Sequence, residues 1–125
     1  EMDAENARVA RLRDQLQEGL TRSIDDVVVN SVEPRLAGHL HLSFPGTDGD
    51  SLLLLLDQLG IEASAGSACH AGVHRMSEVL EAMGVSEHEG LGSLRFTLGR
   101  TTTQEDVDVV LRELPAVVEK ARQVF

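Results

Sequence analysis

Cys69 is the residue of this chain with the clearest capacity for chemistry. It is the only cysteine, and it lies within the small-residue segment SAGSACHAG at positions 64–72. The glycines of this segment allow sharp backbone turns, and no bulky side chain shields the thiol. A structural cysteine more often sits among large apolar residues on a periodic element. The composition is therefore compatible with a reactive thiol that moves to its target, and also with an inert one.

Arg95 is the second candidate. It stands between Leu94 and Phe96 in an alternating stretch that predicts a strand, so its side chain is expected on the face opposite the core. A guanidinium binds a carboxylate through two parallel hydrogen bonds, which suits an anionic substrate. The alternative is a solvated arginine that pairs with a surface acid. Arg100, which follows a glycine, is expected to be structural or to anchor a loop.

The five histidines are candidate metal ligands. Cys69 and His70, with His74 four positions later, superficially resemble a zinc motif. Structural zinc usually takes four protein ligands, several of them cysteines, so one cysteine with histidines on a loop makes a poor cage. No metal site is predicted from the five histidines, which are His39, His41, His70, His74 and His88.

Composition limits the classes of protein that the chain can represent. With 125 residues, of which 42% are hydrophobic, it is expected to form one globular domain. A formal net charge of −10 argues against nucleic-acid binding. One cysteine excludes an intrachain disulfide and suits a reducing cytoplasm. The apolar run 52–56 is too short to span a bilayer, and no signal-peptide pattern opens the chain, so a cytoplasmic protein without membrane contact is expected.

Apolar side chains at three- and four-residue spacing predict amphipathic helices in several segments. Thr47 with Asp50, and Thr102 with Glu105, have the spacing of capping boxes at the starts of two of them. Pro115 is expected to kink or split the last helix. The predicted helical segments are 3–22, 47–60, 76–83 and the segment that follows Thr102.

Short alternating or β-branched runs predict strands at 27–29, 39–44, 61–63 and 93–98. The polar, glycine-bounded segment 86–92 is expected to be a loop. The resulting fold class is α+β, with a small sheet of three or four strands covered by helices.

Three motifs resemble the NifS/IscS-type cysteine desulfurases of the class V aminotransferase family. The loop 64–70 with Cys69 is similar to the active-site loop of that family. Residues 93–100 with 102–108 resemble the following strand and helix start, and 42–46 with 52–57 resemble the segment before the loop. The motifs occur in the family's order. The resemblance implies that 1–125 is a single domain, the C-terminal small domain of a fold-type I pyridoxal-phosphate enzyme, without the large domain that binds the cofactor.

The resemblance also implies roles for the two candidates. The Cys69 thiolate would take sulfur from L-cysteine as a persulfide and yield L-alanine, while Arg95 would grip the substrate carboxylate. It further implies pyridoxal phosphate as cofactor, a homodimeric full-length enzyme, and an iron–sulfur scaffold or other acceptor protein for the sulfur. His70 departs from the family, whose loop more often carries threonine or another small polar residue there, and its role stays open.

The single lysine, Lys120, is expected on the solvent face of the last helix, near Glu119 and Arg122. Pyridoxal phosphate is held as a Schiff base to lysine, so the isolated chain is expected to bind no cofactor and to be inactive. Three alternatives remain: a selenocysteine lyase-type enzyme, a non-enzymatic sulfur carrier or interaction module, and a structural fragment whose cysteine is inert. A lysine-bearing domain upstream would favour the desulfurase.

Overall fold

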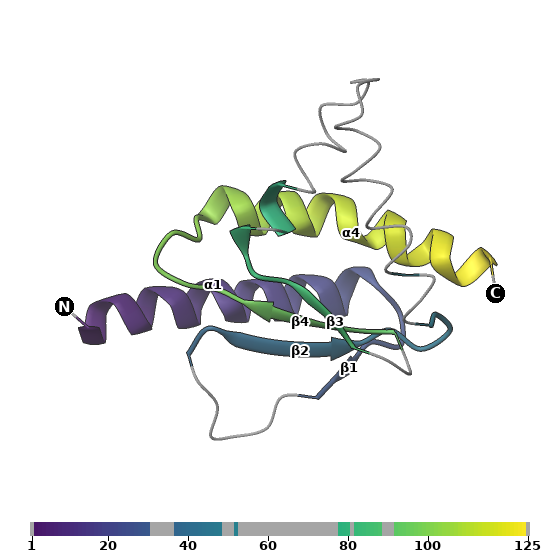
Figure 1. Cartoon of the computed structure of the whole chain (residues 1–125), viewed down its shortest axis with the longest axis horizontal. Helices are drawn as coiled ribbons and strands as arrows, with labels where there is room; N and C mark the ends of the chain where they lie inside the picture. The colour runs from purple at the N-terminus through teal and green to yellow at the C-terminus, as the bar shows by residue number, and fades with distance from the viewer. Residues whose placement is uncertain are drawn as a thin grey trace.

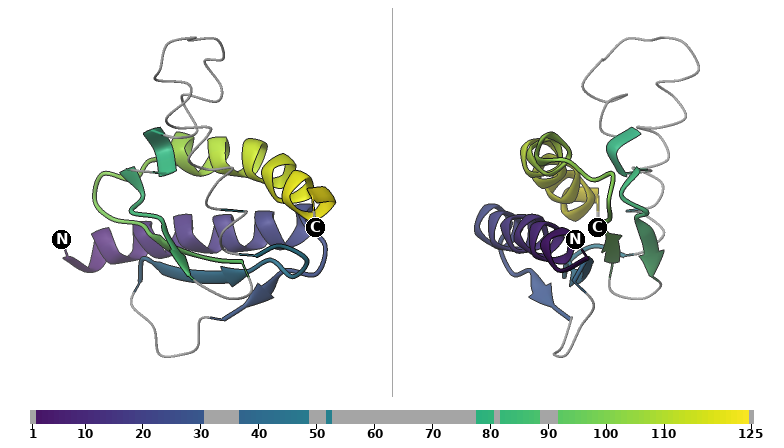
Figure 2. Two further views of the ribbon diagram at one scale, coloured as in Figure 1. Left: turned by 45° about the vertical axis from the view of Figure 1, so that its right-hand side comes forward. Right: turned by 90° about the vertical axis from the view of Figure 1, so that its left-hand side faces the viewer.

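Two long helices lie side by side on one face of an antiparallel sheet in the computed structural model (Figures 1 and 2). The structure describes residues 2–30, 37–48, 52, 78–80, 82–88 and 92–124. This architecture confirms the predicted α+β class. The elements are α1 (Met2–Ser23), β1 (Val28–Val29), β2 (His39–Ser43), β3 (Ser86–His88), β4 (Ser93–Thr97) and α4 (Gln104–Val124).

The sheet has four strands in the order β1-β2-β4-β3, and each neighbouring pair is antiparallel. The alternation predicted for β2 and β4 is confirmed, because Leu40, Leu42, Leu94 and Phe96 are fully buried. Leu40 pairs with Phe96 and Leu42 with Leu94, so the core face is shared by both central strands. β1 is shorter than predicted, and its two valines are exposed.

The segment 86–92 was expected to be a loop, and this prediction is wrong for its first three residues. Ser86–His88 forms β3, an edge strand that pairs with β4. An edge strand is held through backbone hydrogen bonds on one side, so polar residues are tolerated there. Three residues are also too few to show the two-residue period by which strands are recognised.

The predicted amphipathic helix 3–22 is confirmed as α1. Leu16 and Leu20 are fully buried, and the helix packs against α4 and the sheet. Gly19 allows the two helices to approach closely, since a Cβ at this position would overlap the side chain of Leu111. In the part of the chain that is described, no helix is long and apolar enough to cross a membrane.

The capping box of α4 lies one residue later than predicted. The Thr103 hydroxyl accepts from the Asp106 amide at 3.1 Å, and the Asp106 carboxylate accepts from the Thr103 amide at 3.0 Å. Thr102 is not available as the cap because its hydroxyl accepts from the Gly99 amide at 2.9 Å in the preceding turn. The reciprocal bonds are those of a capping box, with aspartate in the place of glutamate.

Pro115 does not split α4, which runs unbroken from Gln104 to Val124. A proline inside a helix removes one backbone hydrogen bond and crowds the preceding turn. Fully buried side chains lie on both sides of it, including Val110, Leu114 and Val118. Their packing holds the helix together through the proline.

The structure describes parts of the chain on either side of segment 53–77, which lies outside the described residues. The Thr47 hydroxyl donates to the Phe44 carbonyl at 2.7 Å and so closes a turn. Leu52 is helical, and its amide donates to the Asp48 carbonyl at 3.0 Å. Asp50 lies outside the described residues, so the capping box at Thr47 stays a prediction. Residues 78–80 and 82 are helical, as predicted, and Gly84 ends this helix with φ 63°. The predicted strand 61–63 and most of the predicted helix 47–60 lie outside the described residues.

Candidate functional site

Arg95 projects from the middle of β4, with β2 on one side and β3 on the other. Its neighbours Leu94 and Phe96 are fully buried, whereas Arg95 is exposed. The predicted orientation is therefore confirmed. The guanidinium is carried by a strand that is fixed in the core, and it lies on the sheet face away from that core.

The register places further polar residues on the same face as Arg95. His41 lies directly opposite Arg95 on β2, and Ser43 lies opposite Ser93. The two serine hydroxyls are hydrogen-bonded at 2.8 Å, and the Asn30 side-chain amide donates to Ser43. This face is therefore polar along both central strands, in contrast to the apolar face beneath the helices.

The connection after β4 is anchored by Arg8 of α1, a residue that the sequence analysis missed. Its guanidinium donates to the carbonyl oxygens of Arg100 and Thr102 at 2.8 Å and to that of Gly99 at 3.2 Å. Arg100, which was expected to be structural or to anchor a loop, takes part in this contact only through its backbone carbonyl, and its side chain is exposed. Local sequence patterns do not predict contacts between residues more than 90 positions apart. From the sequence alone, Arg8 is therefore expected to be an ordinary arginine on the surface of a helix.

Two glycines fix the ends of β2 and β4 against each other. A Cβ on Gly38 would overlap the Leu98 carbonyl oxygen, and the Leu98 amide donates to the Gly38 carbonyl at 2.8 Å. At the other end, Gly92 has φ 64°, and a Cβ there would overlap the Thr47 hydroxyl. β4 is thereby held at both of its ends, which fixes the position of Arg95 between them.

Cys69 lies outside the described residues, as do His70 and His74. The structure therefore gives no distance between the thiol and Arg95. Among the described residues, no group of three or more histidine, cysteine or acidic side chains is placed to hold a metal ion.

The described residues do not fit pyridoxal phosphate. Lys120 is exposed on α4, as predicted, and faces solvent rather than a pocket. A Schiff-base lysine needs a site that encloses the cofactor and orients it toward the substrate. No step of the chemistry is therefore assigned to a cofactor held by this part of the chain.

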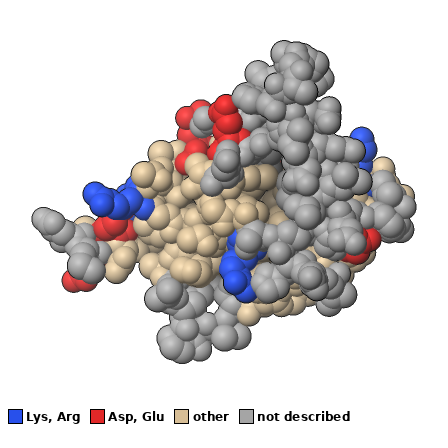
Figure 3. Space-filling view, in the orientation of Figure 1, with Lys and Arg blue, Asp and Glu red and all other residues tan. Residues whose placement is uncertain are grey.

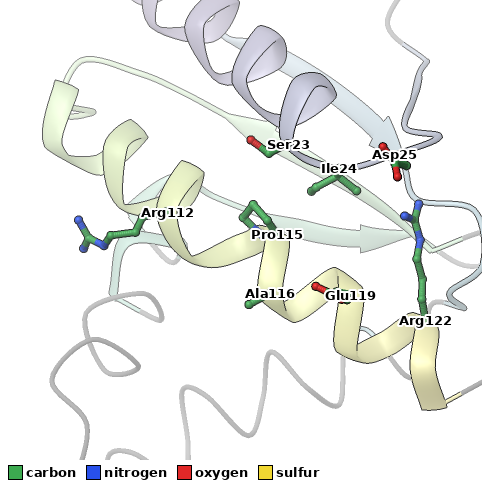
Figure 4. A pocket seen from close by; sticks show the side chains of 8 residues that line it. All are labelled: Ser23, Ile24, Asp25, Arg112, Pro115, Ala116, Glu119 and Arg122. Carbon is green, nitrogen blue, oxygen red and sulfur yellow. The ribbon is translucent and has the colours of Figure 1, made fainter.

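A surface groove of about 480 Å³ lies between the C-terminal parts of α1 and α4. Figure 4 shows Arg122 extending from α4 toward Asp25, and the Arg122 Nε donates to the Pro45 carbonyl at 2.8 Å. Acidic and basic residues both line this groove, and none of its lining residues belongs to the sheet. It is thus separate from the polar sheet face around Arg95. On the face shown in Figure 3, the described residues form no continuous basic patch.

The chain belongs to the aminotransferase class-V family, which matches residues 1–110. An IscS-like cysteine desulfurase of Mycobacterium tuberculosis is 49% identical over 124 residues, which are 98% of this chain and 32% of that protein. The cysteine desulfurase NifS of Azotobacter vinelandii is 38% identical over 98% of this chain and 31% of its own length. The chain thus spans about a third of these relatives.

The fold has a counterpart among solved structures. The X-ray structure of a NifS-like protein from Rickettsia africae superposes with a TM-score of 0.60, covering 93% of this chain and 29% of that one at 20% identity. At this identity the likeness concerns the fold, and it agrees with the α+β architecture described above.

Proposed function

We propose that this chain is the C-terminal small domain of a pyridoxal-phosphate-dependent cysteine desulfurase. The observation that carries the proposal is the match of almost the whole chain to relatives named cysteine desulfurase, together with the family's loop motif around Cys69 and strand motif around Arg95. The full-length protein would take sulfur from L-cysteine and release L-alanine.

In this proposal Cys69 is the nucleophile. Its thiolate attacks the substrate sulfur, because the thiolate rather than the thiol is the reactive form. A sulfur–sulfur bond forms as the carbon–sulfur bond of the substrate breaks. The electron pair of the broken bond takes up a proton and becomes a carbon–hydrogen bond of L-alanine, while the sulfur remains on Cys69 as a persulfide.

Arg95 is proposed to bind the substrate carboxylate. A guanidinium on the exposed face of a fixed central strand can offer two parallel donors without rearrangement of the backbone. Binding the carboxylate would orient the substrate sulfur for transfer. This role is one of substrate capture and differs from the chemical role of Cys69.

The cofactor is proposed to be held by the two thirds of the relatives that this chain does not match. Pyridoxal phosphate there would activate the substrate for cleavage of its carbon–sulfur bond. The full-length protein is further proposed to be a cytoplasmic homodimer that passes persulfide sulfur to an iron–sulfur scaffold or another acceptor thiol.

The test uses the full-length protein with L-cysteine, and it measures alanine formation and the gain of one sulfur atom on the protein by mass spectrometry. Cys69→Ser should abolish both, whereas the neighbouring Ser67→Ala should retain both. Arg95→Ala should lower kcat/KM by about 30- to 1,000-fold, and Arg95→Lys should recover only part of this because it loses the bidentate geometry. Alanine formation by Cys69→Ser at the wild-type rate would refute the proposal.

Two further comparisons separate the alternatives. A selenocysteine lyase-type enzyme would show a higher kcat/KM for L-selenocysteine than for L-cysteine. A sulfur carrier would gain sulfur on Cys69 only when another enzyme supplies it. The isolated 125-residue chain is expected to form no alanine from L-cysteine.

A further inference from the structure

His41 is the side chain placed directly across the β2–β4 ladder from Arg95. Directly opposed residues of an antiparallel pair lie on the same face, with Cβ atoms about 4.5–5.5 Å apart. On the other side of Arg95 the opposed residue is Ser86 of β3. His41 is therefore the neighbour of Arg95 on the β2 side of this sheet face.

The two residues differ in burial. His41 is half-buried with its Nε2 atom inaccessible to solvent, whereas Arg95 is exposed. A partly buried planar ring next to an arginine on the same sheet face provides a surface on which the planar guanidinium can lie.

From this arrangement we propose that His41 is a positioning residue for Arg95. It restricts the guanidinium to orientations that receive the substrate carboxylate, and it acts through Arg95 without contacting the substrate. A side chain that is ordered before binding loses less conformational entropy when the ligand arrives. The inference rests on the proposed function, in which Arg95 binds the carboxylate.

The chain offers a matched control on the same strand. His39 lies two positions earlier on the same face, is also half-buried, and is opposed by Thr97 instead of Arg95. In the full-length protein, His41→Ala should raise KM for L-cysteine by about 3- to 10-fold and leave kcat within about twofold. His39→Ala should change neither. His41→Phe, which keeps a planar ring, should restore most of the lost affinity.

A double-mutant cycle decides whether His41 acts through Arg95. In the Arg95→Ala background, His41→Ala should have no further effect on KM. The dissociation constant of L-cysteine in the Cys69→Ser background, where turnover is blocked, should follow the same pattern. Thermal unfolding of each variant reports any loss of folding separately from a loss of affinity.

The outcomes distinguish the inference from the function on which it rests. A KM that is unchanged in Arg95→Ala would overturn the proposed substrate role of Arg95. A KM that rises in Arg95→Ala but stays unchanged in His41→Ala would overturn only the positioning role. An equal effect of His41→Ala with and without Arg95, or an equal effect of His39→Ala, would also overturn it.

Discussion

Replacing Arg8 with alanine should destabilise the chain more than any other single change on the exposed side of α1. Its guanidinium donates three hydrogen bonds to the backbone carbonyls of 99–102 and pairs with Glu5 at 3.0 Å. A hydrogen bond from a charged donor contributes about 1.5–3 kcal/mol. The Arg8 side chain is 33% exposed, so water can replace part of these bonds, and the exposed pair with Glu5 adds about 0.5 kcal/mol or less.

We therefore expect Arg8→Ala to lower the free energy of unfolding by about 2 kcal/mol, which corresponds to a fall in Tm of about 6–10 °C for a domain of this size. Urea unfolding of the 125-residue chain, followed by circular dichroism, measures the change. Arg11→Ala is the matched control, since Arg11 is exposed on the same helix and donates no hydrogen bond to the described residues. Arg8→Lys should recover less than half of the loss, because one ammonium cannot reach three carbonyls. Equal stabilities of Arg8→Ala and Arg11→Ala would refute the anchoring role.

Three further predictions concern the same fold, and urea unfolding measures each. Gly38→Ala should cost more than about 2 kcal/mol because its Cβ would overlap a backbone carbonyl oxygen just after β4, whereas Gly99→Ala meets no atom within 4 Å and should be nearly neutral; similar costs would contradict this packing. Thr103→Ala should lower the free energy of unfolding by about 1 kcal/mol because it removes the capping hydroxyl, whereas Thr101→Ala, at an exposed residue two positions earlier, should change it little; equal effects of the two would contradict a cap at Thr103. Pro115→Ala should stabilise α4 by about 1–3 kcal/mol because it restores a backbone donor in the helix interior, and a loss of stability would show that the proline ring itself is needed for packing.

The elements with strong periodicity could be predicted from the sequence. α1, β2, β4 and α4 each place several large apolar residues on one face, and burying that face decides their structure. The exposed orientation of Arg95 follows from the same alternation. β3 could not be predicted, because three polar residues at a sheet edge are held by backbone pairing, which leaves no apolar signal.

Local sequence patterns do not predict details that depend on contacts between distant segments. Three adjacent threonines precede α4, and the sequence cannot tell which one caps it. The Gly99 amide donates to the Thr102 hydroxyl, and the Thr103 hydroxyl caps the helix instead. Arg8 is a similar case, since its partners lie in a loop that only the packing of α1 against α4 and β2 brings within reach. The Cys69 loop remains a prediction from the family's motif.

Several independent features of the fold fix the orientation of Arg95, as the proposed binding of a carboxylate requires. A shift of β4 by one residue would turn Arg95 into the core and expose Leu94 and Phe96. Burial of each such side chain stabilises the fold by about 1.5–3 kcal/mol, so the shift would cost several kcal/mol. Burying the Arg95 charge would add to this cost. The Gly38 contact and the Arg8 anchor resist the same shift from the end of the strand. The backbone of β4 is therefore fixed, and under the proposed function any adjustment to a substrate would occur in the Arg95 side chain, beside His41.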